Sequence, residues 1–373
     1  MPSRKTLIAK PRIFGGALAL LLSGLLALPA FAEDAAPAPS PTAPPTIVAA
    51  PAMVPSAPFS WKVYRTSADF PDRAPVVHRL VGSVHLLPES AYPLPSGLQA
   101  AYAETSGLVL ETDPSALEEP EFQKNFLDAA RAPNGLKASV EPALYELLQQ
   151  RSAKMQVPAA SAACEPFRAW FCALSLELFR LQSQGVSGEL GLDRHFYTRA
   201  LRDGRSVRWL EEPGAQLAIF STMNDAQSAQ FLEATLQGMG ESGSDPADLV
   251  RQWRSNDQST MERTVADMKR VYPDPYERIL GARNRAWIPR LEALFGESRP
   301  LMVVVGAAHL LGPDGLPVQL AARGWTVEPV TGTEAAPVPA PAKPPADQPA
   351  PLLVPVGAGP NKPGVAAKPV AAS

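Results

Sequence analysis

The sequence is poor in several features that mark well-known classes of protein. Two cysteines among 373 residues are too few for a disulfide scaffold, and a formal net charge of −3 lacks the basic excess of a nucleic-acid binder. The patterns HExxH and G-x-S-x-G and the P-loop are missing from the sequence, and the G-x-G-x-x-G of residues 238–243 follows a predicted helix rather than the strand that a dinucleotide-binding fingerprint requires. These absences argue against nucleic-acid partners, nucleotide chemistry and an ordinary serine nucleophile.

One long apolar run, over residues 13–28, follows a positively charged head and precedes the small residues Ala30 and Ala32. This order is typical of a secretory signal, so we expect residues 1–32 to be removed by cleavage after Ala32. The alternative is an uncleaved membrane anchor, because the run is nearly long enough to span a bilayer. Cleavage predicts a periplasmic or secreted protein without stable membrane insertion.

Prolines gather at the two ends of the remaining chain. Eight of the 42 prolines lie in 33–58 and eleven lie in 332–373, where the sequence has no periodic apolar face. Such segments favour extended, solvated conformations, so we expect a disordered linker and a disordered tail. Both are candidates for contact with proline-reading, periplasmic or envelope partners. The residues between them, 59–331, have ordinary globular composition and are expected to form the core.

Short apolar runs alternate with helical patterns through this core. Strands are predicted over 59–63, 78–84, 107–112, 206–211, 300–306 and 325–330. Helices are predicted over 95–105, 118–130, 140–155, 166–184, 190–203, 225–239, 259–272, 275–295 and 315–323. No strand is expected between 118 and 204. The sequence therefore predicts an α/β domain with a long helical insertion.

Two of the predicted strands end in the same pattern. Gly82-x-x-His85 and Gly306-x-x-His309 each follow an apolar run and precede two leucines, in a sequence with only four histidines. Glycine allows a sharp turn or a close approach of the backbone, and the histidine then emerges just beyond the strand. Because ligand sites of open α/β sheets lie beyond the carboxyl ends of the strands, both histidines are candidate site residues.

Two glutamates, Glu111 and Glu211, end two further strands in the same way. Two imidazoles and two carboxylates form a mixed ligand set that suits Zn²⁺, Mn²⁺, Co²⁺ or Fe²⁺ and can activate a water for attack on a carbonyl. We predict His85, Glu111 and His309 as metal ligands, and these three with Glu211 as catalytic residues. The alternative keeps the same residues without a metal, with one histidine as general base and a glutamate orienting the water.

Other polar residues are weaker candidates. Asp113 and Glu212 each precede a proline, so the first is also an ordinary turn former and the second is expected to begin a helix. His78 has an odd spacing from His85, which places the two side chains on opposite faces of a strand and predicts a packing role. His195 lies on an amphipathic helical pattern and is interpreted as a surface or packing residue.

The stretches Val81-Gly-Ser-Val-His-Leu-Leu-Pro88, Leu108-Val-Leu-Glu-Thr-Asp113 and Val305-Gly-Ala-Ala-His-Leu-Leu-Gly312 resemble the TraB/GumN family. Residues 191–193, 207–211, 283–284 and 320–327 continue the resemblance, which covers 59–331. This family is similar to the Tiki metalloproteases and, more distantly, to the ChaN and erythromycin-esterase-like folds. The resemblance implies a mixed central sheet flanked by helices, with the paired Gly-x-x-His motifs and acidic residues in one cleft.

Arg283 lies on a predicted helix that returns toward the last strands. Its guanidinium is predicted to hold a carboxylate of the site or the carbonyl of a substrate. The state of Cys164 and Cys172 is left open by the sequence. On one helix their Cα atoms would be about 12 Å apart, too far for a disulfide, but Cys164 could also precede the helix and fold back.

Two functions of different classes are consistent with these residues. We predict an exported, peptidase-like, metal-dependent hydrolase that acts on a peptide or small-molecule substrate. The alternative is a non-catalytic periplasmic protein that uses the same cleft to bind or sequester a peptide or a small ligand.

Overall fold

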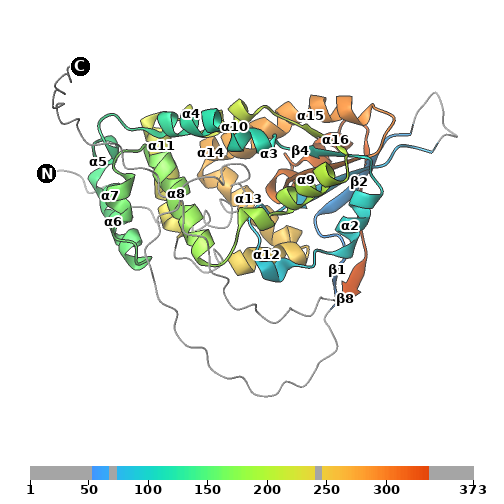
Figure 1. Cartoon of the computed structure of the whole chain (residues 1–373), viewed down its shortest axis with the longest axis horizontal. Coiled ribbons are helices and arrows are strands. Elements are labelled where there is room, and N and C mark those ends of the chain that lie inside the picture. Colours follow the sequence, from blue (N-terminus) through green and yellow to red (C-terminus); the bar gives the residue numbers. More distant parts are fainter. Residues whose placement is uncertain (1–52, 67–73, 240–245, 336–373) are drawn as a thin grey trace, which may run out of the picture.

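The computed structural model describes residues 53–66, 74–239 and 246–335. The main sheet, which has six strands, lies toward one end of the folded region, and a group of helices that includes α6, α7, α8 and α11 lies toward the other (Figure 1). The predicted signal segment, 1–32, lies outside the described residues.

The six strands of the main sheet have the spatial order β5-β4-β6-β3-β2-β7. They are β2 (Ser60–Tyr64), β3 (His78–Ser83), β4 (Gly107–Leu110), β5 (Ser206–Trp209), β6 (Leu301–Gly306) and β7 (Thr326–Pro329). The first four in spatial order pair in parallel, whereas β2 pairs antiparallel with both β3 and β7. The predicted α/β fold with a mixed sheet is confirmed, and every predicted strand is present with ends displaced by at most two residues.

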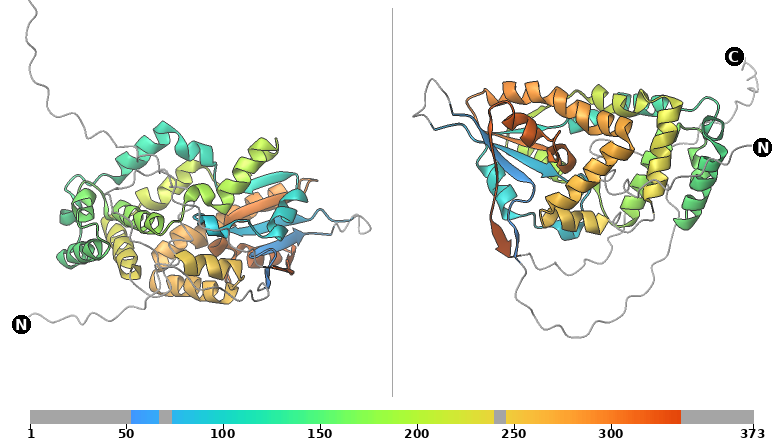
Figure 2. Two further views of the ribbon diagram at one scale, coloured as in Figure 1. Left: turned by 60° about the horizontal axis from the view of Figure 1, so that its bottom comes forward. Right: turned by 180° about the vertical axis from the view of Figure 1, so that it is seen from behind.

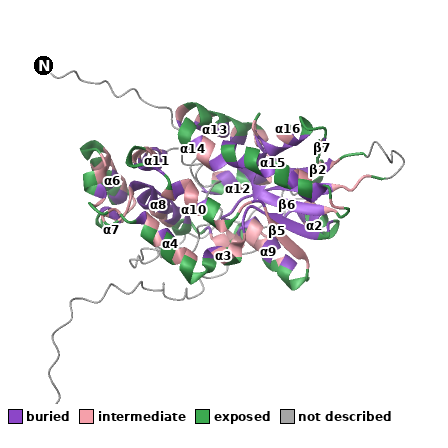
Figure 3. Cartoon of the chain, turned by 90° about the horizontal axis from the view of Figure 1, so that it is seen from above, coloured by how far each residue is buried: buried purple, intermediate pink, exposed green. Residues whose placement is uncertain are grey.

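Strand β6 lies between β4 and β3, and all six of its residues are buried. A strand covered on both faces needs a continuous apolar run, which Leu-Met-Val-Val-Val supplies. Figure 3 shows that the neighbouring strands are also largely buried, whereas the helices are exposed on their outer sides. Because β3, β4, β5 and β6 are parallel, the residues that follow each of them meet at one edge of the sheet.

Helices connect the strands and surround the sheet (Figure 2). They are α2 (Ser96–Ala103), α3 (Pro114–Glu118), α4 (Pro120–Ala130), α5 (Leu136–Ser139), α6 (Pro142–Lys154), α7 (Ala160–Cys164), α8 (Ala169–Ser183), α9 (Leu192–Arg202), α10 (Pro213–Ser221), α11 (Asp225–Gly238), α12 (Pro246–Arg254), α13 (Gln258–Val271), α14 (Pro273–Tyr276), α15 (Ala282–Phe295) and α16 (Leu316–Ala321). Three 3₁₀ turns, η1 (Glu89–Ala91), η2 (Gly188–Leu190) and η4 (Ala307–Leu310), and one π-helical turn, η3 (Glu277–Gly281), complete the set. Each predicted helix is present, but the sequence patterns do not predict α3, α5, α7, α10 and α12.

The helical insertion is confirmed, since residues 118–204 are all described and contain no strand. Within it, Cys164 ends α7 and Cys172 lies in α8, and the two form a disulfide with Cα atoms 5.3 Å apart. Arg168 has an extended backbone between the two helices, with φ −68° and ψ 152°. The chain therefore folds back before α8 begins, which resolves the question that the sequence leaves open.

A second, two-stranded sheet joins β1 (Met53–Pro55) to β8 (Thr333–Ala335) in antiparallel pairing. The backbone of Ser56 continues this link, because it receives a hydrogen bond from Gly97 and donates one to Gly332. The expectation that 33–58 and 332–373 lack regular structure is therefore wrong for these inner ends. Their proline content conceals two short strands that pair with each other, and the rest of both segments lies outside the described residues.

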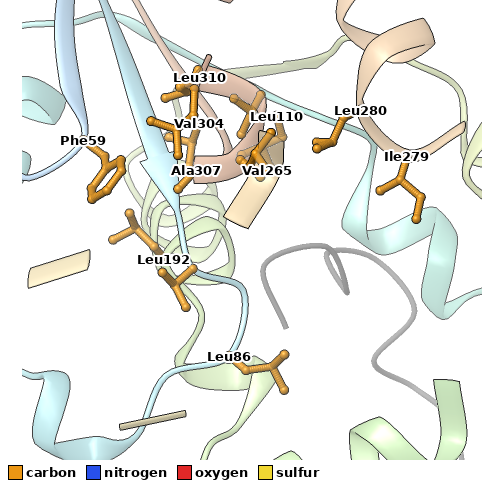
Figure 4. Close-up of a cluster of buried hydrophobic side chains, with 14 of the residues drawn as sticks. Phe59, Leu86, Leu110, Leu192, Val265, Ile279, Leu280, Val304, Ala307 and Leu310 are labelled. Carbon is orange, nitrogen blue, oxygen red and sulfur yellow. The ribbon is translucent and has the colours of Figure 1, made fainter. Parts of the chain in front are cut away.

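The core is continuous beneath the carboxyl edge of the sheet. Figure 4 shows Leu110, Val304, Ala307 and Leu310 grouped near the strand ends, and all four are buried.

Within the part of the chain that is described, no helix has both the length and the apolar character needed to cross a membrane.

Candidate functional site

The four predicted catalytic residues follow the four parallel strands. His85 follows β3, Glu111 follows β4, Glu211 follows β5 and His309 lies in η4 after β6. The prediction that His85, Glu111 and His309 converge is confirmed. Oε1 of Glu111 lies 3.8 Å from Nε2 of His85 and 3.9 Å from Nε2 of His309.

Close packing fixes the turn that carries His85. A Cβ at Gly82 would lie only 2.8 Å from Cβ of Phe59, so glycine is needed for the close approach of the residue that precedes β2. A Cβ at Gly191 would clash with the carbonyl oxygen of His85. The backbone N–H of Leu192 donates to the carbonyl of Val84 at 3.1 Å. The start of α9 is therefore held directly against the His85 turn.

This contact brings Asp193, in the first turn of α9, to His85. Oδ1 of Asp193 lies 2.9 Å from Nδ1 of His85 and accepts a hydrogen bond from the Ser83 hydroxyl, also at 2.9 Å. An ionised carboxylate only accepts, so Nδ1 carries a proton and the lone pair of the neutral ring is on Nε2. Burial opposes protonation of His85, but the charge and hydrogen bond of Asp193 outweigh burial and raise its pKa.

Nε2 of His85 is the unusual atom of the site. It is buried and has no hydrogen-bond partner among the described residues. Leaving a buried polar atom unpaired costs about 1–3 kcal/mol, and such atoms are rare enough to need an explanation. Its distance of 3.8 Å from Glu111 is too long for a direct hydrogen bond.

Arg283 lies at the centre of the acidic residues. Its Nη2 donates to Oε2 of Glu111 and to Oε1 of Glu211, both at 2.6 Å, and its Nε donates to Glu211 at 3.1 and 3.2 Å. Its Nη1 donates to the carbonyl of Ile279 and lies 3.1 Å from Nε2 of His309. All five N–H groups of a guanidinium are thereby directed at protein acceptors.

Both glutamates are further fixed by neutral donors. Glu111 accepts the backbone N–H of Gly306 at 2.7 Å, and Glu211 accepts the indole N–H of Trp287 at 2.9 Å. Burial opposes ionisation of Glu111, but the Arg283 guanidinium outweighs burial and holds its pKa well below the usual range. Burial likewise opposes the charge of Arg283, but the two carboxylates outweigh it and raise the pKa.

His309 has a different second partner from His85. Asn284 donates from Nδ2 to the carbonyls of His309 and Asp314, so its Oδ1 is the oxygen that faces Nδ1 of His309 at 2.6 Å. Nδ1 is therefore the protonated nitrogen, and Nε2 accepts from Arg283. Burial lowers the pKa of His309 to about 3; the Glu111 charge opposes this effect, and the smaller effect of the Arg283 charge adds to it. The ring also packs on Trp287, with centroids 4.4 Å apart.

The π-helical turn η3 ends immediately before α15 and sets the direction in which that helix faces. The Ile279 carbonyl within η3 accepts from the Arg283 side chain. Because a π turn adds a residue to the helical repeat, the side chains after it rotate relative to those before it. Arg283, Asn284 and Trp287 consequently face the strand ends together.

The predicted carboxylate contact of Arg283 is confirmed, and its predicted contact with substrate stays a prediction. Asp193, Asn284 and Trp287 were not predicted as site residues. The first two lie in stretches that resemble the TraB/GumN family, which is the signal that could have identified them. Trp287 lies on the tryptophan-bearing helix that continues the same resemblance after Arg283 and Asn284.

The weaker candidates have structural partners. Asp113 caps α3 by accepting from Ser115, and Glu212 is the residue before α10. His78 is buried, stacks on Phe295 at 4.2 Å, and has a pKa that burial lowers to about 4. His195 is half-buried and contacts two aromatic rings. The packing role predicted for His78 is confirmed, and His195, predicted as a surface or packing residue, packs on aromatic rings.

The donors predicted to bind a metal are only partly suited to one as they are placed. Nε2 of His85 is available, but Nε2 of His309 and both oxygens of Glu111 already accept hydrogen bonds. Among the described residues, no group of three or more His, Cys, Asp and Glu side chains is arranged to hold a metal ion. A buried guanidinium also places a positive charge beside the same atoms. The arrangement does not fit a metal ion, and metal dependence stays a prediction.

Comparison with known proteins agrees with the sequence pattern. The family described as TraB/PrgY/gumN matches residues 72–329, which include both Gly-x-x-His turns and both glutamates. The chain is 26% identical over 245 residues to the uncharacterized protein YbaP of Escherichia coli (strain K12), covering 65% of this chain and 86% of that protein. The same values hold for YbaP of Shigella flexneri. No solved structure matches the chain. With the family match extending over more than half of its length, the chain belongs to the TraB/PrgY/gumN family.

Proposed function

We propose that this protein is an exported hydrolase that cleaves a peptide or a related acyl compound. The observation that carries the proposal is the buried, unpaired Nε2 of His85, which Asp193 orients from behind. A water placed between Nε2 and Oε1 of Glu111 would reach both atoms, because they are 3.8 Å apart. It would satisfy the unpaired nitrogen and lie in the position of an attacking nucleophile.

In the proposed reaction His85 acts as general base and then as general acid. Its Nε2 takes a proton from the water while the water oxygen bonds to the substrate carbonyl carbon. Asp193 stabilises the imidazolium that forms, and Glu111 accepts the second hydrogen of the water. The imidazolium then gives its proton to the leaving group as the tetrahedral intermediate collapses. Glu211 acts indirectly in this proposal, because it holds Arg283, which holds Glu111.

The proposed location is the periplasm or the extracellular space, and it depends on the signal-like sequence of residues 1–32. Since that sequence predicts export after cleavage, the mature protein is the form to assay. The proposed substrates are small molecules or peptides rather than nucleic acids, because the chain has no basic excess.

A cleavage screen tests the proposal. Purified mature protein is incubated with a peptide library and with ester and amide compounds, with chelator and separately with Zn²⁺, Mn²⁺, Co²⁺ or Fe²⁺. We expect turnover that persists in chelator and is lost in the His85→Gln variant. Tight binding of a peptide without cleavage under every condition would favour the sequestering protein instead. Turnover that depends on added metal would restore the metal prediction.

A further inference from the structure

Arg283 lies among acceptors that a cation in this site could use. The guanidinium contacts Glu111, Glu211 and His309, and each contact is between 2.6 and 3.2 Å. All of these side chains are buried or almost buried, with exposed side-chain fractions of 9% for Arg283, 6% for Glu111 and 10% for Glu211. Two ionised carboxylates in such a place require a positive charge close by.

The charge balance of the cluster depends on Arg283. His309 contributes no charge in this arrangement, because its Nδ1 donates to Asn284 and its Nε2 accepts from Arg283, so the ring carries one proton. Glu111 and Glu211 together bring two negative charges, and Arg283 is the positive group that donates to both. Arg283 also packs over Trp287, with 4.5 Å from the guanidinium carbon to the ring centroid. The planar guanidinium of Arg283 is therefore held by the indole ring on one face and by hydrogen bonds at its edges.

A divalent metal ion would use the same atoms. Carboxylate oxygens and an imidazole nitrogen are the ligands that Zn²⁺ and Mn²⁺ take, and a ligand must present its lone pair to the ion. In this site the lone pair of His309 Nε2 and one oxygen of Glu111 face N–H groups of Arg283. The guanidinium and a metal ion therefore exclude each other, by shared ligands and by like charge.

We infer that Arg283 is the resident cation of this site, in the place of a metal ion, and that its removal creates a divalent-metal site from Glu111, Glu211 and His309. The inference concerns which cation the carboxylates hold. It does not require the protein to be a hydrolase, so its test measures metal binding and stability rather than turnover.

The first measurement is the metal content of purified wild-type mature protein. We expect well under one equivalent of Zn, Mn, Co or Fe, and no change in the thermal midpoint when ZnCl₂ or MnCl₂ is added. About one equivalent of metal, removable by chelator with a fall in the midpoint, would overturn the inference.

The second measurement uses Arg283→Met, which keeps an unbranched stem but removes the charge. We expect its midpoint to fall by roughly 10 °C without metal, since two buried carboxylates lose their partner. Added ZnCl₂ or MnCl₂ should restore about 5 °C or more once it exceeds its dissociation constant about 100-fold. Titration with a competing chromophoric chelator should then give about one site per chain.

Arg285→Met is the matched control, because Arg285 lies two positions along the same helix, is 56% exposed and pairs with Glu277. It should show neither the fall nor the response to metal. Adding Glu111→Gln to Arg283→Met should weaken metal binding at least about tenfold, since a neutral amide replaces a charged ligand. Should Arg283→Met not fold in buffer, refolding in ZnCl₂ against refolding in chelator decides the question. Failure in both would overturn the inference.

Discussion

The two Gly-x-x-His turns share a sequence pattern and a place in the sheet, but they give their histidines opposite surroundings. His85 has an anionic partner, Asp193, at Nδ1 and no hydrogen-bond partner at Nε2 among the described residues. His309 has a neutral partner, Asn284, at Nδ1 and a cation, Arg283, at Nε2. The pKa of His85 is raised because Asp193 outweighs burial, and that of His309 is lowered to about 3. One motif thus gives an imidazole with an unpaired Nε2 after β3 and a fixed neutral acceptor after β6.

The largest expected effect is a difference in activity between the variants of His85 and His309. His85→Gln should lower kcat/KM about 10³-fold, the size expected for loss of a general base. His309→Gln should lower it about tenfold, because the lone pair of His309 Nε2 already accepts from Arg283 and so His309 positions Arg283 rather than acting as the base. His195→Gln is the control, since this histidine lies outside the site. Initial rates on one substrate compare the three variants, and a reversed order would exchange the roles assigned to His85 and His309.

Removing the anionic partner should make His85 resemble His309. Asp193→Asn should lower kcat/KM about 10²-fold, because the amide no longer stabilises the imidazolium. Since the base works in its neutral form, activity rises as pH passes upward through the pKa of His85. The Asp193 charge raises that pKa, so the variant should have its rising limb at lower pH. A pH profile that keeps its position would show that Asp193 only supports the fold.

The third comparison concerns stability at acid pH. A histidine with a folded pKa of about 3 and an ordinary value of 6.5 contributes stability that is present above 6.5 and is lost as pH falls toward 3. It should therefore add up to about 1.4 kcal/mol per pH unit to the slope of the unfolding free energy in this window. His309→Gln should remove that part of the slope. Denaturant unfolding at several pH values measures the slope. An unchanged slope in His309→Gln would mean that another group, and not His309, takes up the proton in this pH window.

The smallest effect should come from the support behind Asp193. Ser83→Ala removes one hydrogen bond to its carboxylate while His85 keeps its own. A single net hydrogen bond is worth about 0.5–1.5 kcal/mol, so kcat/KM should fall about three- to tenfold. The rising limb should also move slightly upward in pH, because a carboxylate with one donor fewer interacts more strongly with the imidazolium. A loss as large as that of Asp193→Asn would mean that Ser83 acts directly.

The sequence predicted the main sheet well because each strand carries its own signal. Buried parallel strands need continuous apolar runs, and the residues at their carboxyl ends meet whatever the order of the strands. That is why His85, Glu111, Glu211 and His309 could be placed at one edge without knowing the topology. The strands β1 and β8 could not be predicted, since each is three residues long and lies in a proline-rich segment.

The contacts that distinguish the two histidines are set by tertiary structure. Asp193 is 108 residues from His85 and reaches it only because the start of α9 packs on the His85 turn. The direction of Arg283 depends on a π turn inside a pattern that predicts one continuous helix over 275–295. Neither feature produces a periodic pattern in the sequence. The residues of the site could therefore be predicted from the sequence, but their hydrogen bonds and charge interactions could not.

The pairing of β1 with β8 also determines how the folded region would bear a load. Met53 lies opposite Ala335, so tension applied through the two ends of the chain would act at the same end of this small ladder. The bonds of an antiparallel pair lie across the strands and would then open one after another, as in unzipping. The next strands along the chain from each end, β2 and β7, are also paired with each other. Tension would therefore open the β1–β8 and β2–β7 pairs before it reached β3 and β6, the strands that His85 and His309 follow.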